Sequence, residues 1–194
     1  MKPKLQHPTL IMIRGLPGSG KSHLAAALAD RLGRDDVVVL DPDTIDLADT
    51  QYLEFSKALE REGLDKAIHP FRWSRKLACD AILAHKIVLW NQPFTNRGIF
   101  ERLVAFLEGC AHEHGLHLPV LVIEVEIDHE VAKERIARRK QDGGHGPSEG
   151  TFAHRAKEYQ SYADGFKTVV VQGTDDVAVS LAAVLRALED LSKD

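Results

Sequence analysis

Short apolar runs alternate with longer amphipathic segments along the chain. Five runs are rich in Val, Ile and Leu and mostly lack two-residue alternation; they are Thr9–Arg14, Val37–Leu40, 87–90, 120–127 and 168–171. Continuous apolar runs of this length are typical of strands that are covered on both faces. The pattern therefore predicts five strands in a sheet with two buried faces.

The segments between these runs have helical periodicity. One helical face carries Phe100, Leu103, Val104 and Leu107, and another carries Val177, Leu181, Val184, Leu185, Leu188 and Leu191. Strands that alternate with helices imply parallel pairing. We therefore expect an α/β fold, a three-layer α/β/α sandwich with a five-stranded parallel sheet, in one domain over residues 1–194. Ligands of such sheets bind beyond the carboxyl ends of the strands, so the residues that follow each strand are the candidates for function.

The strongest motif follows the first strand. Residues 15–22 are Gly15, Leu16, Pro17, Gly18, Ser19, Gly20, Lys21 and Ser22, which fit G-x-x-x-x-G-K-[ST], the phosphate-binding P-loop. The strand before the motif and the helix-like segment after it supply the required context. Glycines let backbone N–H groups face a phosphate, Lys21 reaches the β- and γ-phosphates, and the Ser22 hydroxyl is a Mg²⁺ ligand. The motif predicts that the chain binds a nucleoside triphosphate with Mg²⁺.

Two carboxylates follow the second strand, in the turn Asp41-Pro42-Asp43. One carboxylate can accept a proton from an attacking hydroxyl, and either can help to hold hydrated Mg²⁺. A structural alternative is that Asp43 caps the next helix, with Asp46 favouring the N-terminus of that helix.

The run Val-Leu-Asp-Pro-Asp-Thr at residues 39–44, after such a P-loop, resembles the zeta-toxin-like and polynucleotide-kinase-like branch of P-loop kinases. The resemblance extends over about residues 9–173. It implies a P-loop kinase type of fold, ATP as the phosphate donor, and Asp43 as the base toward the acceptor hydroxyl. Members of that group phosphorylate nucleotide sugars, polynucleotide 5′-hydroxyls or other small alcohols, so the resemblance implies a reaction more than a substrate.

Asn91 and Gln92 follow the third strand, where many P-loop enzymes have an acidic residue and zeta-like proteins often carry Glu. Their amides hydrogen-bond a sugar or a Mg²⁺-bound water but are not general bases at neutral pH. This departure argues against an ATPase or a motor, and against an exact zeta-type substrate. We assign Asn91, Gln92, Asp41 and Arg97 to acceptor binding; a polar turn before a helix is the alternative.

Residues 44–85 form a long helical segment, which the resemblance places beside the acceptor. Arg72 and Arg75 are candidates for binding an anionic acceptor such as a nucleotide or a sugar phosphate. A solvated basic face is the alternative for these arginines. Trp73 and Leu77 follow helical spacing and are expected to be packing residues.

Residues 129–160 contain two Arg-bearing helical segments joined by a Gly-rich loop, and we expect them to form a lid. Arg135 and Arg139 are four residues apart and share a helical face, and Arg155 lies on the second segment. A kinase lid closes over ATP, excludes water and brings Arg to the transferring phosphoryl group. We assign Arg139 and Arg135 to catalysis and Arg155 to nucleotide binding; a solvated charged helix is the alternative.

Composition excludes some classes. The 194 residues are 44% hydrophobic and 28% charged, as in soluble globular domains, and the formal net charge of −4 argues mildly against a large nucleic-acid footprint. Cys79 and Cys110 indicate no disulfide framework, no apolar run approaches the length of a transmembrane helix, and the ten histidines show no zinc-ligand spacing. We expect a cytoplasmic protein without membrane association.

These features predict a kinase that uses ATP and Mg²⁺ to phosphorylate a hydroxyl of a small molecule such as a nucleotide sugar or another alcohol. One alternative is a 5′-hydroxyl polynucleotide kinase, with a nucleic acid as acceptor. Another alternative is a switch or partner-binding module that binds ATP without transferring phosphate. The sequence leaves the acceptor, the oligomeric state and any antitoxin partner unassigned.

Overall fold

The computed structural model describes residues 7–191. Five strands form one parallel sheet in the order β2-β3-β1-β4-β5; they are β1 (Thr9–Arg14), β2 (Val37–Leu40), β3 (Ile87–Asn91), β4 (Val120–Glu126) and β5 (Thr168–Gln172). The predicted five-stranded parallel sheet is confirmed, and no strand end differs from its expected position by more than one residue.

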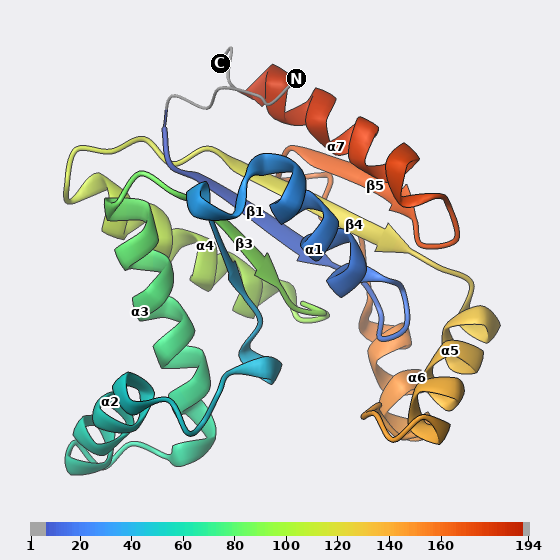
Figure 1. Cartoon of the computed structure of the whole chain (residues 1–194), viewed down its shortest axis with the longest axis horizontal. Coiled ribbons are helices and arrows are strands. Elements are labelled where there is room, and N and C mark those ends of the chain that lie inside the picture. Colours follow the sequence, from blue (N-terminus) through green and yellow to red (C-terminus); the bar gives the residue numbers. More distant parts are fainter. Residues whose placement is uncertain (1–6, 192–194) are drawn as a thin grey trace.

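Helices cover both faces of the sheet. They are α1 (Lys21–Leu32), α2 (Thr50–Arg61), α3 (His69–Leu83), α4 (Arg97–His112), α5 (His129–Gln141), α6 (Glu149–Glu158) and α7 (Val177–Leu191), with 3₁₀ turns η1 (Arg34–Asp36), η2 (Pro42–Thr44) and η3 (Lys66–Ile68). Figure 1 shows α1 and α7 on one face and α3 and α4 on the other, which confirms the three layers. None of the helices between residues 7 and 191 is long and apolar enough to cross a bilayer.

Four of the five strands, β1 to β4, contribute to two cores because successive side chains point to opposite faces of a sheet, whereas β5 contributes to the α1 and α7 side only. Met12 and Trp90 pack with α3 and α4, whereas Ile11 and Leu89 pack with α1 and α7. All six residues of β1 are buried. Burial from both sides explains why the strands appear in the sequence as continuous apolar runs.

Two groups of helices flank the carboxyl ends of the strands. Figure 1 shows α2 and the first half of α3 on one side of these ends, and α5 and α6 on the other. A small apolar cluster of Leu16, Ala132, Ile136 and Phe152 attaches α5 and α6 to the loop after β1. The segment 44–85 and the segment 129–160 are both largely helical, as predicted.

Candidate active site

The loop after β1 requires glycine at three positions, Gly15, Gly18 and Gly20. Gly18 and Gly20 have φ angles of 85° and 99°, a left-handed region in which side chains with a Cβ are disfavoured. A Cβ on Gly18 would also lie 2.6 Å from the carbonyl oxygen of Ala132 in α5. Gly20 ends the loop and precedes the first residue of α1, so strand, loop and helix follow one another as the motif predicts.

Lys21 is buried at the start of α1. Its Nζ donates a hydrogen bond of 3.0 Å to the carbonyl oxygen of Leu16 within the same loop. Burial lowers the pKa of Lys21 from 10.5 to about 8, because an ammonium group loses hydration in the interior. A buried, poorly compensated ammonium is suited to an anionic ligand.

Four charged side chains act on Lys21. After burial, the largest influence on its pKa is the charge of Asp41, which raises it; Arg139 and Arg155 lower the pKa, and Asp43 raises it. These groups come from η2 and its flank, from α5 and from α6. The fold therefore gathers around the P-loop lysine both carboxylates of the Asp turn and two of the three predicted lid arginines.

Asn91 joins the P-loop to the Asp turn. Its Nδ2 donates to Ser22 Oγ at 3.0 Å and to Asp41 Oδ2 at 2.7 Å. The Asn91 side chain is buried, and its Oδ1 atom has no hydrogen-bond partner among the described residues. Strand order explains the bridge, because β3 lies between β2 and β1 and its last residue therefore lies between the ends of both neighbours.

The two carboxylates of the Asp turn have different environments. Asp41 caps η2, accepting a hydrogen bond of 3.0 Å from the backbone N–H of Asp43, and burial raises the pKa of Asp41. Asp43 is exposed, and its carboxylate has no hydrogen-bond partner in the part of the chain that the structure describes. The next helix, α2, is capped by Asp49, which accepts from the N–H of Tyr52. The capping alternative for Asp43 is therefore wrong, because Asp41 and Asp49 cap the two elements.

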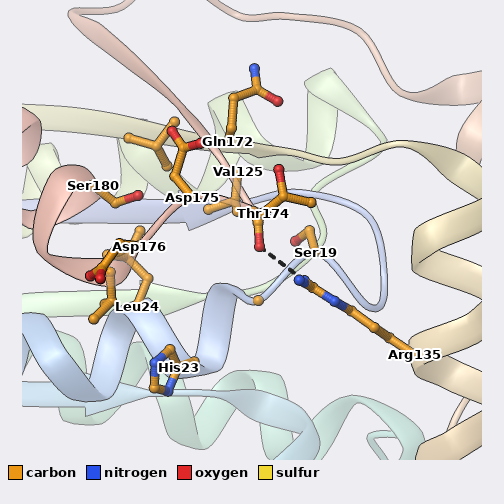
Figure 2. A pocket seen from close by; sticks show the side chains of 14 residues that line it. Ser19, His23, Leu24, Val125, Arg135, Gln172, Thr174, Asp175, Asp176 and Ser180 are labelled. Carbon is orange, nitrogen blue, oxygen red and sulfur yellow. Dashed lines mark hydrogen bonds between the residues drawn. The ribbon is translucent and has the colours of Figure 1, made fainter.

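A cavity of about 570 Å³ lies on the other side of the P-loop (Figure 2), lined in part by Ser19, His23, Gln172, Thr174 and Asp175. Arg135 extends from α5 toward it and donates to the carbonyl oxygens of Gly173 at 2.9 Å and Gly18 at 3.3 Å. Arg135 therefore faces this cavity, whereas Arg139 and Arg155 act on Lys21.

The side chains of Gln92 and Arg97 have partners outside this network. Gln92 Oε1 accepts from Trp90 Nε1 at 3.0 Å. Arg97 forms ion pairs with Glu101 at 2.7 Å and Asp164 at 2.6 Å. The positive charge of Arg97 is therefore already neutralised by protein carboxylates.

The two predicted acceptor arginines lie on α3. Arg72 is exposed, and Arg75 is half-buried with its guanidinium 5.5 Å from the ring centroid of Phe106 in α4. Trp73 is buried and Leu77 packs against the core, as predicted.

Sequence reasoning missed a buried ion pair directly before the P-loop. Arg14 and Glu124 are 2.5 Å apart, with side chains 0% and 1% exposed. Glu124 also accepts from Ser161 Oγ at 2.8 Å and from the N–H of Tyr162 at 2.7 Å, and the Arg14 guanidinium lies 3.6 Å from the Tyr162 ring centroid. The available signal was a charge in each of two apolar strands, Arg14 in the first and Glu124 in the fourth, although the fourth strand also carries Glu126 at its exposed end. This pair attaches the segment after α6 to the ends of β1 and β4.

A parallel sheet with a P-loop after its central strand, and helices on both faces, defines an α/β fold of the P-loop kinase type. The chain belongs to the AAA domain family, whose sequence profile matches residues 10–163. A search of the curated proteins finds no match to this chain.

Solved structures share the fold. A gluconokinase from Sinorhizobium meliloti 1021 has 17% identity and a TM-score of 0.60, over 96% of this chain and 94% of that one. A chain from the PezAT chromosomal toxin–antitoxin system of Streptococcus pneumoniae has 12% identity and a TM-score of 0.62, over 100% and 90%. A deoxyadenosine kinase from M. mycoides has 15% identity and a TM-score of 0.52, over 94% and 99%. At these identities the likeness shows a common fold.

Proposed function

We propose that the chain is an ATP- and Mg²⁺-dependent phosphotransferase of the zeta-toxin-like and polynucleotide-kinase-like type, which moves the γ-phosphate to a hydroxyl of a small molecule. The observation that carries the proposal is the network at the carboxyl edge of the sheet. In it Asn91 links Ser22 of the P-loop to Asp41, while the charges of Asp41 and Asp43 both act on Lys21. The kinase names of the gluconokinase and the deoxyadenosine kinase among the similar folds support it.

The residues present fit Mg²⁺. This ion is usually held by one or two protein oxygens together with waters and substrate phosphates. The exposed Ser22 hydroxyl and the Asp41 carboxylate are oxygen donors joined through Asn91, whose buried Oδ1 remains available to a bound water. Bound there, Mg²⁺ would offset the negative charge of the β- and γ-phosphates. Within residues 7–191, no group of three or more His, Cys, Asp and Glu side chains could hold a metal alone.

The protein groups then have distinct tasks in the transfer. Lys21 and the loop N–H groups hold the β- and γ-phosphates. The acceptor oxygen bonds to the γ-phosphorus, its proton passes to the Asp43 carboxylate, and the bond from the γ-phosphorus to the bridging oxygen breaks to release ADP. Asp43 suits this task because its carboxylate is exposed and makes no other hydrogen bond among the described residues.

The lid arginines divide between two tasks. Arg139 and Arg155, which act on Lys21, offset charge on the transferring phosphoryl group, and Arg135 contacts the nucleotide beside the 570 Å³ cavity. This proposal exchanges the roles that the sequence suggested for Arg135 and Arg155. That cavity, bounded by the loop after β5, receives the base of the nucleotide. The small cluster of Leu16, Ala132, Ile136 and Phe152 keeps α5 against the P-loop.

Asp43→Asn tests the proposal. The variant is expected to reduce transfer from γ-labelled ATP by about 10²-fold or more, because an amide accepts no proton, while ATP affinity stays within a few-fold. Label transfer is measured by mass spectrometry with a cell-extract metabolite pool and, separately, with short oligonucleotides. Asp46→Asn is the matched control on the same loop, since its Oδ1 can still accept from the Ala48 N–H and transfer should persist.

Two results would contradict the proposal in different ways. Wild-type transfer by Asp43→Asn would remove Asp43 as the base. ATP binding by the wild-type chain without transfer to any acceptor would instead favour a nucleotide-dependent switch.

A further inference from the structure

The two cysteines of the chain lie on neighbouring helices. Cys79 belongs to α3 and Cys110 to α4, and both are free thiols that are partly exposed. The chain has no other cysteine. Neither thiol has a task in the proposed phosphoryl transfer, so a role for the pair has to come from its own geometry.

The helices α3 and α4 pack on each other and run in the same direction. The helix α3 leads into β3, α4 leads from β3 to β4 on the same face, and the strands that they connect all pair in parallel. Helices that return the chain between parallel strands run opposite to those strands, and therefore parallel to each other. Figure 1 shows both helices on one face of the sheet.

One contact sets the register of the two helices. The Arg75 guanidinium of α3 lies 5.5 Å from the centroid of the Phe106 ring in α4. Cys79 and Cys110 each come four residues, about one turn, after these two residues, so in parallel helices they face each other as well. Cys79 also packs against the apolar cluster that contains Ala111, the residue after Cys110.

Small residues let the two helices approach closely around the thiols. Ala78 and Ala81 of α3 and Ala111 of α4 are buried in one cluster. Helices with axes about 8–10 Å apart and Cα atoms about 2.3 Å from each axis bring facing Cα atoms to about 3.5–5.5 Å at the nearest. A disulfide spans about 4.4–6.8 Å between Cα atoms. The two ranges overlap, so facing cysteines on closely packed helices are suited to a disulfide.

The two thiols have unequal reactivity. Burial is the main cause that raises the pKa of Cys79 to about 12, and a hydrogen bond that its S–H makes with Cys110 is the next. A thiol with this pKa is protonated at neutral pH and is a poor nucleophile. The first attack on an oxidant therefore falls to Cys110, and Cys79 is the thiol that resolves the intermediate.

We propose that Cys79 and Cys110 are a redox-sensitive pair that closes a reversible disulfide between α3 and α4 by exchange with a low-molecular-weight disulfide. The Cys110 thiolate attacks one sulfur of that disulfide, whose S–S bond breaks to release one thiol and leave a mixed disulfide on Cys110. The Cys79 sulfur then attacks Cys110 Sγ, and its proton goes to the second thiol, which leaves. The protein loses two electrons and two protons, and the small disulfide is reduced to two thiols.

The bond would fasten a helix that borders the Asp turn. Trp73 and Leu77, which precede Cys79 on α3, line a cavity of about 330 Å³ together with Asp41 and Thr44. Oxidation would therefore join one wall of this cavity to α4. The pairing of the thiols itself does not depend on the phosphotransferase function.

Oxidation of the folded full chain with oxidised glutathione, followed by iodoacetamide and intact mass measurement, tests the proposal. The wild type should lose the mass of two hydrogen atoms, remain a monomer and take up no alkyl group, and dithiothreitol should restore alkylation of both thiols. Cys79→Ser should retain one glutathione on Cys110, because no second thiol resolves it. Cys110→Ser should keep an alkylatable Cys79. A glutathione adduct on Cys110→Ser but not on Cys79→Ser would contradict the proposed order of attack.

Thermal unfolding shows whether the folded chain accommodates the bond. A disulfide between positions 79 and 110 closes a loop of about 30 residues, which should raise Tm by roughly 5–10 °C relative to the reduced chain. The two Ser variants, treated in the same way, are the matched controls and should keep their Tm. Alanine at either position gives the same comparison if a Ser variant folds poorly.

Three results would overturn the proposal. They are two alkylated thiols in the wild type after oxidation, disulfide-linked dimers in place of the internal bond, and a lower Tm for the oxidised chain than for the reduced one. Each of these results leaves the proposed phosphoryl transfer untouched, and failure to find transfer leaves the thiol pair untouched.

Discussion

Glu124→Gln is expected to destabilise the fold through the buried Arg14–Glu124 pair. The substitution preserves size and an acceptor oxygen for the Tyr162 N–H, but removes the only negative charge that pairs with Arg14 among the described residues. Arg14 keeps its hydrogen bonds to the carbonyl oxygens of Gln160 at 2.7 Å and Phe94 at 3.0 Å. The perturbation is therefore mainly the loss of charge compensation for a guanidinium with 0% exposure.

The expected magnitude follows from this geometry. Removing one partner of a buried ion pair typically lowers the free energy of unfolding by about 3–5 kcal/mol, because the other charge stays buried. Arg14 retains two carbonyl acceptors and the faces of Tyr159 and Tyr162, at 4.2 and 3.6 Å from the ring centroids, so we expect the lower end, about 3 kcal/mol. For a chain of this length that corresponds to a fall in Tm of roughly 6–12 °C.

Thermal and urea unfolding of five proteins measure the effect. They are the wild type, Glu124→Gln, Arg14→Met, the double variant Arg14→Met/Glu124→Gln, and Glu126→Gln as a control on the exposed end of the same strand. The double variant should be more stable than the sum of its single effects predicts, because it leaves no unpaired charge. If Glu124→Gln unfolds within about 2 °C of the wild type, or if the two single effects are additive, the pair has no such role.

Three further predictions concern the P-loop and its neighbours. The pKa of Lys21 is about 8 in the folded state and 10.5 in the unfolded state, so the free energy of unfolding rises as the pH increases between these values. At pH 8.5 Lys21 is mostly neutral, so binding of an anionic nucleotide, which favours the ammonium form, takes up protons. Calorimetry in buffers of different ionisation enthalpy checks the uptake, which should vanish in Lys21→Arg; equal uptake in both proteins would refute it. Gly173→Ala should reduce ATP affinity by about tenfold, because the added Cβ would collide with the Ser19 carbonyl oxygen of the P-loop. Unchanged affinity, measured by calorimetry, would show that the loop after β5 moves to accommodate the methyl group without affecting the nucleotide. Asn91→Asp puts a second carboxylate against Asp41. Thermal unfolding of this variant should therefore give a free energy of unfolding about 1–2 kcal/mol lower at pH 7 than at pH 5, and Mg²⁺ should restore it. The reasoning fails if neither pH nor Mg²⁺ changes the stability of the variant.

Local pattern was sufficient for the sheet and the P-loop. The three central strands, β1, β3 and β4, are buried on both faces, so their composition identified them without any knowledge of their neighbours. The P-loop was readable because its glycines, Lys21 and Ser22 occupy fixed offsets within one loop. Both signals lie within about a dozen consecutive residues.

Contacts between distant segments could not be predicted in the same way. Asn91 is 69 residues from Ser22 and 50 from Asp41, and Arg14 is 110 residues from Glu124. Each of these pairs depends on the strand order, which the sequence pattern does not specify. The ion pair of Arg97 with Glu101 could have been predicted, because the two residues are four apart on one helix and carry opposite charges.

The strand order also explains why an amide, Asn91, can stand at the end of β3, where many P-loop enzymes have an acidic residue. In the order β2-β3-β1, the last residue of β3 lies between the Asp turn and the P-loop, so an amide there donates to both Asp41 and Ser22. A carboxylate at that position would repel Asp41, whereas Asn91 holds Asp41 by a hydrogen bond and leaves the negative charge on the turn after β2. The proposed Mg²⁺ donor and the proposed base then come from one turn, two residues apart. An amide after β3 cannot activate water as a base, so this arrangement favours transfer to an acceptor hydroxyl beside Asp43 over hydrolysis.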